Sequence, residues 1–252
     1  MENIWTIKNI FKINPLVYIF LVISIVTASY KIFIIISFLI TIHELGHFLI
    51  AILFGLETDK IYIYPLGGIS KINIPLNTNF YKEFIILIMG PIFQNIGYIL
   101  LIMIINDNIL VTRIHLGILL FNLLPIYPLD GGKLVNLIMN KIIPYKLSYR
   151  IIIYISYIFN IIILFCNKKI SINMILIYMM LIIIIRKEQN KEKFIYNKFL
   201  LERYLNHCHY KKNIIIKNEN NFYKTKNNIL YDGKNYYSEK TFLTKKFKKN
   251  QK

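Results

Sequence analysis

Long apolar runs, joined by short polar connections, fill the chain from Asn14 to Ile185. A helix needs about 20 apolar residues to cross a bilayer, and these runs approach or reach that length. The pattern predicts six membrane-spanning helices, at roughly Asn14–Ser29, Ile32–Phe54, Phe84–Ile105, Ile109–Leu124, Tyr149–Phe165 and Ser171–Ile185. Gly90-Pro91 lies inside the third run and predicts a kink there.

A different pattern separates the second and third runs, in the stretch DKIYIYPLGGISKINIPLN. Ile61 and Ile63 alternate with Tyr62 and Tyr64, and a proline and two glycines then interrupt the alternation. Such a pattern is typical of a short β-hairpin or re-entrant loop at the membrane surface. Its backbone would have to be covered by protein or water.

The chain becomes polar from Arg186 onward. A helix leaving the membrane is expected first, followed by short strands in NIIIK and NILYDGKNYY, with a hairpin turn at Asp232-Gly233. This segment looks too short and polar to bury much core by itself. We therefore expect an all-α polytopic membrane protein with a small polar C-terminal tail. Its predicted parts are a membrane domain, residues 1–185, and a basic cytoplasmic tail, residues 186–252.

Composition and charge agree with a membrane protein. The chain is 56% hydrophobic with a mean hydropathy of +0.48, which excludes an ordinary soluble domain. The net charge is +18, and 18 of the 31 lysines and arginines lie from Arg186 to the C-terminus. Positive charge collects on cytoplasmic segments, where it meets anionic lipid. Nucleic-acid binding is not expected, because the tail has no recognisable reader motif.

The lysine and arginine bias also predicts the topology. With the N-terminus inside, the inner segments carry nine of these residues before the tail, and the outer segments carry four. Both termini are therefore expected in the cytoplasm. The first run could instead be a signal peptide, but it has no clear small-residue cleavage site, and an uncleaved span is favoured.

The second run contains HELGH, three ionisable groups within an apolar helix. An ionisable group at the centre of a bilayer costs about 3 kcal/mol, so a shared partner is expected. His43 and His47 are four residues apart and lie on one helix face, where both can bind one metal ion. Glu44 can reach a water on that metal and act as a general base. Gly46 lets another backbone approach beside the site.

A third metal ligand is expected in FNLLPIYPLDGGKL, Phe121 to Leu134. Its prolines and glycines predict an irregular backbone that holds Asp130 near the cytoplasmic side. Taken alone, Asp130 could be the N-cap of a short helix over Lys133–Ile143. Beside HELGH the ligand interpretation is stronger, because two histidines leave zinc short of protein ligands. His115 is a weaker alternative and is more typical of a polar packing residue.

Three motifs together, HELGH, PLGG and NLLPIYPLDGG, resemble those of the site-2 protease family of intramembrane zinc metalloproteases. The resemblance covers roughly Asn14 to Tyr204. It implies that His43, His47 and Asp130 bind zinc and that Glu44 is catalytic. It also implies that Asn122, Gly67 and Gly68 lie near the substrate and bind it.

Within that family the resemblance is to a sporulation member that processes the precursor of sigma-K. It implies a membrane-associated pro-sigma factor as substrate, inhibitory membrane partners and a location in the membrane around the forespore. The tail shows no complete CBS domain, so nucleotide binding is left open, as is self-association. Two alternatives remain: an intramembrane metal transporter, and a non-catalytic membrane regulator of the same fold.

Overall fold

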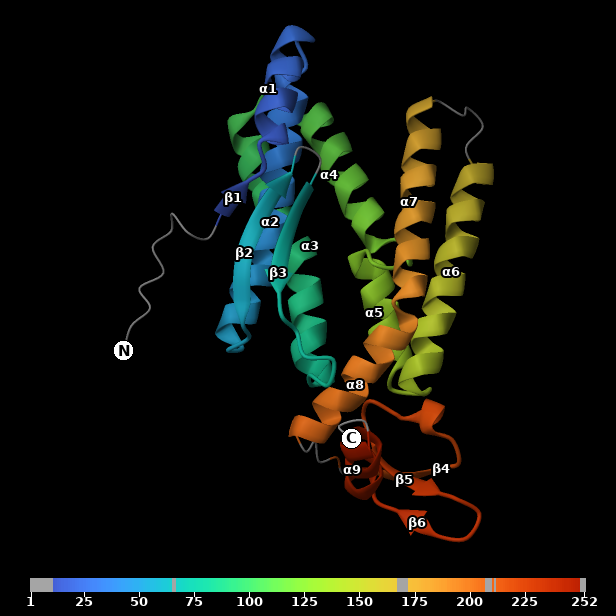
Figure 1. The fold of residues 1–252 in the computed structure, drawn as a ribbon. Helices are drawn as coiled ribbons and strands as arrows, with labels where there is room; N and C mark the ends of the chain where they lie inside the picture. Colours follow the sequence, from blue (N-terminus) through green and yellow to red (C-terminus); the bar gives the residue numbers. More distant parts are fainter. Residues whose placement is uncertain (1–10, 65–66, 167–171, 207–209, 211, 250–252) are drawn as a thin grey trace. The chain divides into compact units, whose positions relative to one another are not determined.

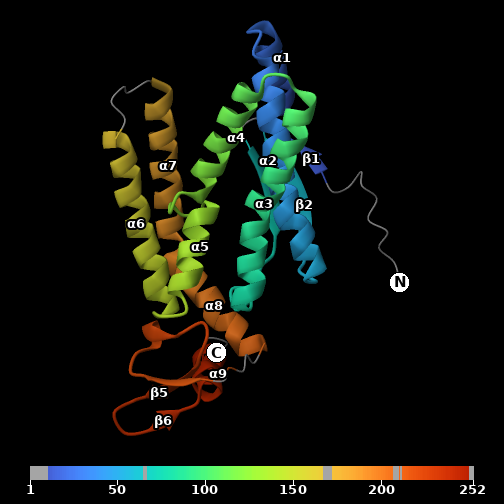
Figure 2. The ribbon, with the colours of Figure 1, turned by 180° about the vertical axis from the view of Figure 1, so that it is seen from behind.

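The computed structural model describes residues 11–64, 67–166, 172–206, 210 and 212–249 (Figures 1 and 2). The described part is mostly helical and contains two small sheets, so the all-α prediction is only partly right. The helices are α1 Leu16–Val26, α2 Tyr30–Leu53, α3 Phe80–Ile104, α4 Asn108–Leu123, α5 Asp130–Met139, α6 Tyr145–Cys166, α7 Ile172–Asn190, α8 Glu192–Asn206 and α9 Glu239–Lys249. A short 3-10 helix, η2, covers Glu219–Asn221.

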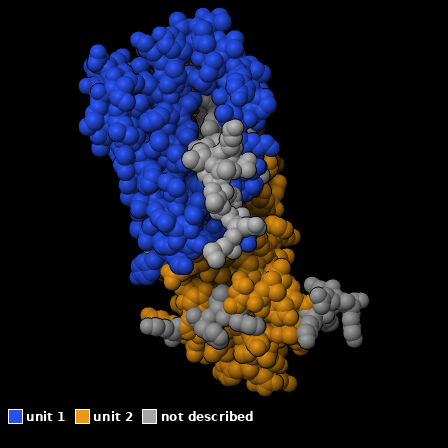
Figure 3. Space-filling model, turned by 90° about the vertical axis from the view of Figure 1, so that its left-hand side faces the viewer, with its two compact units in different colours: residues 1–74, 81–122 blue, residues 75–80, 123–252 orange. Residues whose placement is uncertain are grey.

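Three helices of the described residues are long and apolar enough to cross a membrane: Tyr30–Leu53, Phe80–Ile104 and Tyr145–Phe165. Helices α1 and α4 are apolar but shorter. All six predicted spans overlap helices, but the number that cross the membrane stays a prediction beyond these three. The chain divides into two compact units, residues 1–74 with 81–122 and residues 75–80 with 123–252 (Figure 3).

The first unit contains a three-stranded sheet along helix α2 (Figure 1). Strands β2, Thr58–Tyr64, and β3, Gly67–Ile72, form the antiparallel hairpin that the alternating pattern predicts. Strand β1, Phe11–Ile13, adds a parallel edge next to β2, with Lys12 paired to Tyr62. Nothing in the sequence predicts β1, because its partner is about 50 residues away.

Small residues let the helices of this unit approach one another closely. A Cβ atom at Gly46 would lie 2.4 Å from the carbonyl oxygen of Met89, so α2 and α3 touch backbone to backbone there. This confirms the prediction for Gly46. Farther along α3, a Cβ at Gly97 would come within 3.2 Å of Ile42. Four buried residues of α2, α3 and α4 form the apolar core beyond this contact: Ile35, Leu39, Leu101 and Val111.

The second unit has two apolar cores. The first joins the segment before α5 to the paired helices α6 and α7, which lie side by side in Figures 1 and 2. Ile126, Tyr149 and Ile185 are central to it, and each is at most 2% exposed. The hydroxyl of Ser156 on α6 accepts a hydrogen bond from the Tyr127 amide at 2.8 Å, which fixes the segment before α5 against α6.

The second core lies in the tail, which is more ordered than its composition suggests. Strands β4, Asn213–Ile216, and β5, Asn227–Tyr231, are parallel, and β6, Tyr236–Tyr237, pairs antiparallel with β5. The turn at Asp232-Gly233 is therefore confirmed as a hairpin. Helices α8 and α9 and η2 complete this part. Its buried core is Tyr145, Tyr196, Phe199, Leu200, Ile216, Phe222, Leu230 and Leu243.

Tyr145 in that core belongs to α6, so the tail segment does not enclose its apolar core by itself. A buried arginine on α8 adds polar contacts. Arg203 pairs with Glu239 of α9 and donates hydrogen bonds to the carbonyl oxygens of Lys224 and Lys226 at 3.1 and 2.9 Å. Its guanidinium thus ties α8 to α9 and to the start of β5.

Candidate metal centre

Helix α2 presents His43 and His47 one turn apart, and the side chains are only 2% and 6% exposed. Their rings meet edge to face, with centroids 4.8 Å apart. Gly90 of α3 provides the room for them. A Cβ atom there would lie 2.2 Å from the Nε2 atom of His47 and 2.9 Å from that of His43. The glycine predicted to mark a kink therefore leaves the space that the histidine pair occupies.

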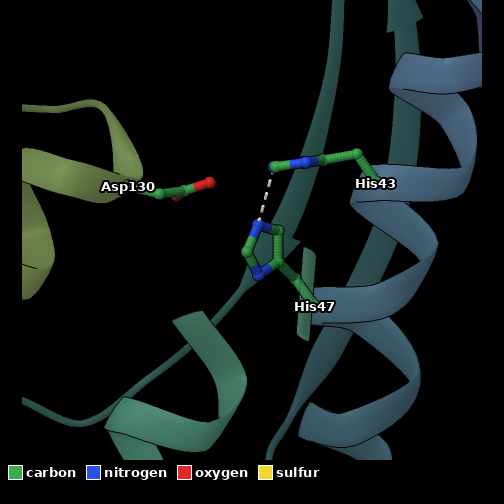
Figure 4. A group of neighbouring side chains, drawn as sticks. All are labelled: His43, His47 and Asp130. Atoms are coloured by element: carbon green, nitrogen blue, oxygen red, sulfur yellow. Dashed lines mark hydrogen bonds between the residues drawn. The ribbon is translucent and has the colours of Figure 1, made fainter. Parts of the chain in front are cut away.

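Hydrogen bonds orient both imidazole rings. Nδ1 of His47 lies 2.7 Å from the carbonyl oxygen of Ile86, which can only accept, so this nitrogen carries the proton. Nδ1 of His43 lies 3.0 Å from the side-chain oxygen of Gln94. In this orientation the two Nε2 atoms face each other at 3.1 Å (Figure 4). Rings that donate through Nδ1 turn their Nε2 atoms toward each other, which is the arrangement by which two imidazoles bind one metal ion.

Asp130 is the first residue of α5, and Leu129 holds the N-cap position. The predicted helix over Lys133–Ile143 therefore begins three residues earlier, and the irregular backbone ends before the aspartate rather than including it. The glycines explain the difference. A Cβ at Gly131 would lie 2.1 Å from the Leu123 carbonyl oxygen, and one at Gly132 would lie 2.5 Å from the Tyr127 nitrogen. Both glycines are helical and let the preceding segment fold tightly over the first turn.

Three described residues could together hold a metal ion: His43, His47 and Asp130. All three are buried, and one ligand atom from each lies within 4.8 Å of the other two (Figure 4). Lys133 also contacts the Asp130 carboxylate at 3.4 Å, from a position that is 44% exposed. Two imidazole nitrogens and a carboxylate oxygen are the protein ligands of a catalytic zinc site, which keeps one position for water or substrate. The residues therefore fit zinc.

Two comparisons with known proteins show what the chain resembles. The family model for peptidase family M50 matches residues 31–112, which include HELGH and all of α3. The solved structure of a site-2 protease from Methanocaldococcus jannaschii superposes with a TM-score of 0.55 at 26% identity. That match covers 73% of this chain and 93% of the other. The chain is thus similar in sequence and in fold to the M50 site-2 proteases.

Two curated relatives support this assignment. Stage IV sporulation protein FB of Bacillus subtilis is 29% identical over 203 residues, which are 76% of this chain and 70% of the relative. A zinc metalloprotease of Methanocaldococcus jannaschii is 34% identical over 168 residues, which are 62% of this chain and 48% of that relative. The protein is thus a multi-pass intramembrane zinc metalloprotease with similarity to the M50 peptidases, and zinc is its cofactor.

The remaining predicted site residues lie on different elements. Glu44 follows His43 on α2 and is half-buried. Asn122 lies in the last turn of α4 and is half-buried. Gly67 and Gly68 begin β3, where their backbones pair with Tyr64 and Ile63 of β2. Their roles in catalysis and substrate binding stay predictions.

Two buried residues beside the site, Gln94 and His115, differ from the sequence-based prediction or were not part of it. Gln94 is completely buried and bonds to a histidine of the pair, yet it is uncharged, so a survey of ionisable groups passes over it. Its position inside the third apolar run was the sequence feature that could have identified this polar amide. His115, considered as a rival ligand, is buried and lies next to Gln94 instead of joining the group of three described above.

Proposed function

We propose that His43, His47 and Asp130 hold the zinc ion and that Glu44 is the general base of an intramembrane endopeptidase. The observation that carries this proposal is the pair of buried Nε2 atoms 3.1 Å apart, on rings whose Nδ1 atoms face the Ile86 carbonyl oxygen and the Gln94 side-chain oxygen. The proximity of an Asp130 oxygen to both nitrogens, within 4.8 Å, supports its role as third ligand.

The predicted chemistry is hydrolysis of a peptide bond. When bound, zinc supplies a Lewis acid that polarises the scissile carbonyl and acidifies the attacking water. The Glu44 carboxylate takes a proton from that water as its oxygen bonds to the carbonyl carbon. Glu44 then gives the proton to the amide nitrogen as the carbon–nitrogen bond breaks, so that a carboxylate and an amine leave the site.

The substrate is proposed to be a membrane-associated protein. Helix α2 is long and apolar enough to span a membrane, so a peptide bond must reach the histidines from within or beside the bilayer. A helical substrate has to unwind first, because its carbonyl groups are hydrogen-bonded inside the helix. We propose that the β2–β3 hairpin, with Gly67 and Gly68, holds the unwound strand, and that Asn122 contacts it near the scissile bond.

We infer that the substrate is a sporulation pro-sigma factor of the sigma-K type. Support comes from the similarity to the Bacillus subtilis stage IV sporulation protein and from the shared motifs. The same reasoning gives a place in the membrane around the forespore and regulation by inhibitory membrane partners. Six spans with both termini in the cytoplasm, and a basic tail from Arg186, complete this proposal.

Co-expression of the full chain with a pro-sigma factor tests the proposal. The wild-type protein should yield a shorter product, and Glu44→Gln should abolish it while the purified variant still contains zinc. A metal transporter would have no special need for a base at this position, and a non-catalytic regulator would give no product. Glu44→Gln protein that still cleaves would refute the base assignment. An uncut pro-sigma factor, beside another membrane protein that is cut, would remove only the substrate class.

A further inference from the structure

Gln94 is a polar residue at the centre of α3, with its side chain completely buried. Its oxygen lies 3.0 Å from Nδ1 of His43. Its nitrogen donates to the carbonyl oxygen of His115 at 3.1 Å and lies 3.4 Å from Nδ1 of that histidine. The amide therefore bridges α2 and α4, and both its oxygen and its nitrogen are hydrogen-bonded.

The direction of these hydrogen bonds follows from the backbone. The His115 carbonyl oxygen can only accept, so the NH2 group of Gln94 must face it. The amide oxygen must then face His43, where it too can only accept. Nδ1 of His43 must therefore carry the proton, which leaves Nε2 as the nitrogen of this ring that can bind a metal ion. A backbone carbonyl group on α4 thus determines, through the Gln94 amide, which nitrogen of His43 on α2 carries the proton.

His115, at the α4 end of this bridge, is held in place by its neighbours. His115 is 3% exposed, and its ring stacks on Tyr98 with centroids 4.3 Å apart and planes 15° from parallel. The Tyr98 hydroxyl lies 3.1 Å from that of Thr112, one turn before His115 on α4. Because the acceptor is a backbone atom in a packed helix, the amide has little freedom to reverse its orientation.

The two histidines differ in what orients them. His47 donates to a backbone carbonyl, that of Ile86, which no substitution of a side chain removes. The His43 ring is instead oriented by a hydrogen bond to a side chain, that of Gln94. A substitution at residue 94 therefore releases one ring and leaves the other oriented.

We propose that Gln94 is a positioning residue for the zinc site, holding His43 in the tautomer that presents Nε2 to the metal. The inference rests on the proposed role of His43 as a ligand. It assigns no contact between Gln94 and zinc or substrate. Loss of a hydrogen-bond partner behind a metal-binding histidine typically costs about 10- to 100-fold in metal affinity.

Zinc affinity of the purified full chain tests the proposal, measured by competition with a chelator after the metal has been removed and Zn²⁺ returned. Gln94→Met fills a similar volume without an acceptor and should weaken zinc binding by about 10- to 100-fold. Gln94→Glu keeps an acceptor oxygen at the same reach for His43, and as the neutral acid its O–H group can donate to the His115 carbonyl oxygen. This variant should restore the affinity to within about threefold of wild type. Asn95→Met is the matched control, because Asn95 is an exposed amide on the same helix that donates a local hydrogen bond to the Pro91 carbonyl oxygen.

The outcomes separate positioning from packing. Weaker binding in Gln94→Met, with recovery in Gln94→Glu and no change in Asn95→Met, supports the proposal. An unchanged affinity in Gln94→Met overturns it, and so does an equal loss in the methionine and glutamate variants. Should Gln94→Met fail to fold, Gln94→Asn replaces it: this amide is one methylene shorter and should also weaken zinc binding, and wild-type affinity would overturn the proposal.

His43→Ala separates this inference from the proposed function. If that variant binds zinc as the wild type does, the ligand assignment itself is wrong. If it loses zinc while Gln94→Met does not, His43 remains a ligand, and only the positioning role is refuted.

Discussion

Gly90→Ala is the sharpest test of the space in which the metal centre is built. The added Cβ atom would lie 2.2 Å from the Nε2 atom of His47, whereas ordinary contacts begin at 3.4 Å. The ring therefore has to retreat by about 1.2 Å, the difference between these two distances. Zinc–nitrogen bonds are about 2.0–2.1 Å long and tolerate deviations of about 0.2 Å. The required shift is several times this tolerance, and the same Cβ also crowds His43.

We expect Gly90→Ala to weaken zinc binding by at least about 100-fold and to reduce cleavage by a similar factor or more. Chelator competition measures the first effect, and the co-expression cleavage assay measures the second. Gly117→Ala on α4 is the control, because a Cβ there meets no atom within 4 Å, and alanine favours a helix by about 0.5–1 kcal/mol over glycine. Zinc affinity and cleavage within threefold of wild type in Gly90→Ala would refute the reasoning.

Two further predictions concern the metal and the tail. Removing zinc with a chelator should abolish cleavage, and returning Zn²⁺ should restore it. Zinc at 100 times its Kd should also raise the free energy of unfolding by about 2.7 kcal/mol, which is measured as a higher Tm. Activity that survives complete zinc removal would contradict the first part. Arg203→Met should destabilise the second unit by about 3–5 kcal/mol in thermal unfolding, since it leaves Glu239 without its buried partner. Lys198→Met, which removes an exposed lysine 4.0 Å from the half-buried Glu202, should cost at most about 1 kcal/mol. Equal effects of the two substitutions would argue against a special role for Arg203.

The helical part of the site could be predicted because its chemistry is local. His43 and His47 face the same way on any helix, so the HELGH spacing suffices to bring them together. The sequence predicted Asp130 as a metal ligand but did not predict that it begins helix α5. Its neighbours Gly131 and Gly132 suggest an irregular backbone, yet they serve as helical positions that another backbone segment crosses at close range. Local pattern alone does not distinguish these two uses of glycine, because the difference lies in what packs against the residue.

Long-range partners explain what the sequence could not reveal. Gln94 and His43 are 51 residues apart, and an uncharged amide gives no sign of which histidine it meets. Strand β1 has three residues and forms only against β2. The tail seemed too polar to hold a core, and it does need Tyr145 from α6, whose ring stacks on Phe199 at 4.1 Å. Each of these features depends on which distant segment folds against it.

The orientation of the histidine pair depends on backbone atoms more than on side chains. The carbonyl oxygen of Ile86 fixes one ring directly, and that of His115 fixes the other through Gln94. Carbonyl oxygens in helices cannot be mutated or protonated, so they impose one polarity as long as the helices pack. Packing in turn relies on Gly46 and Gly90, which bring α3 against α2 and leave room for the rings. It follows that a substitution which separates α2 from α3 should disturb zinc binding even when it touches neither histidine, whereas one on their lipid-facing sides should not.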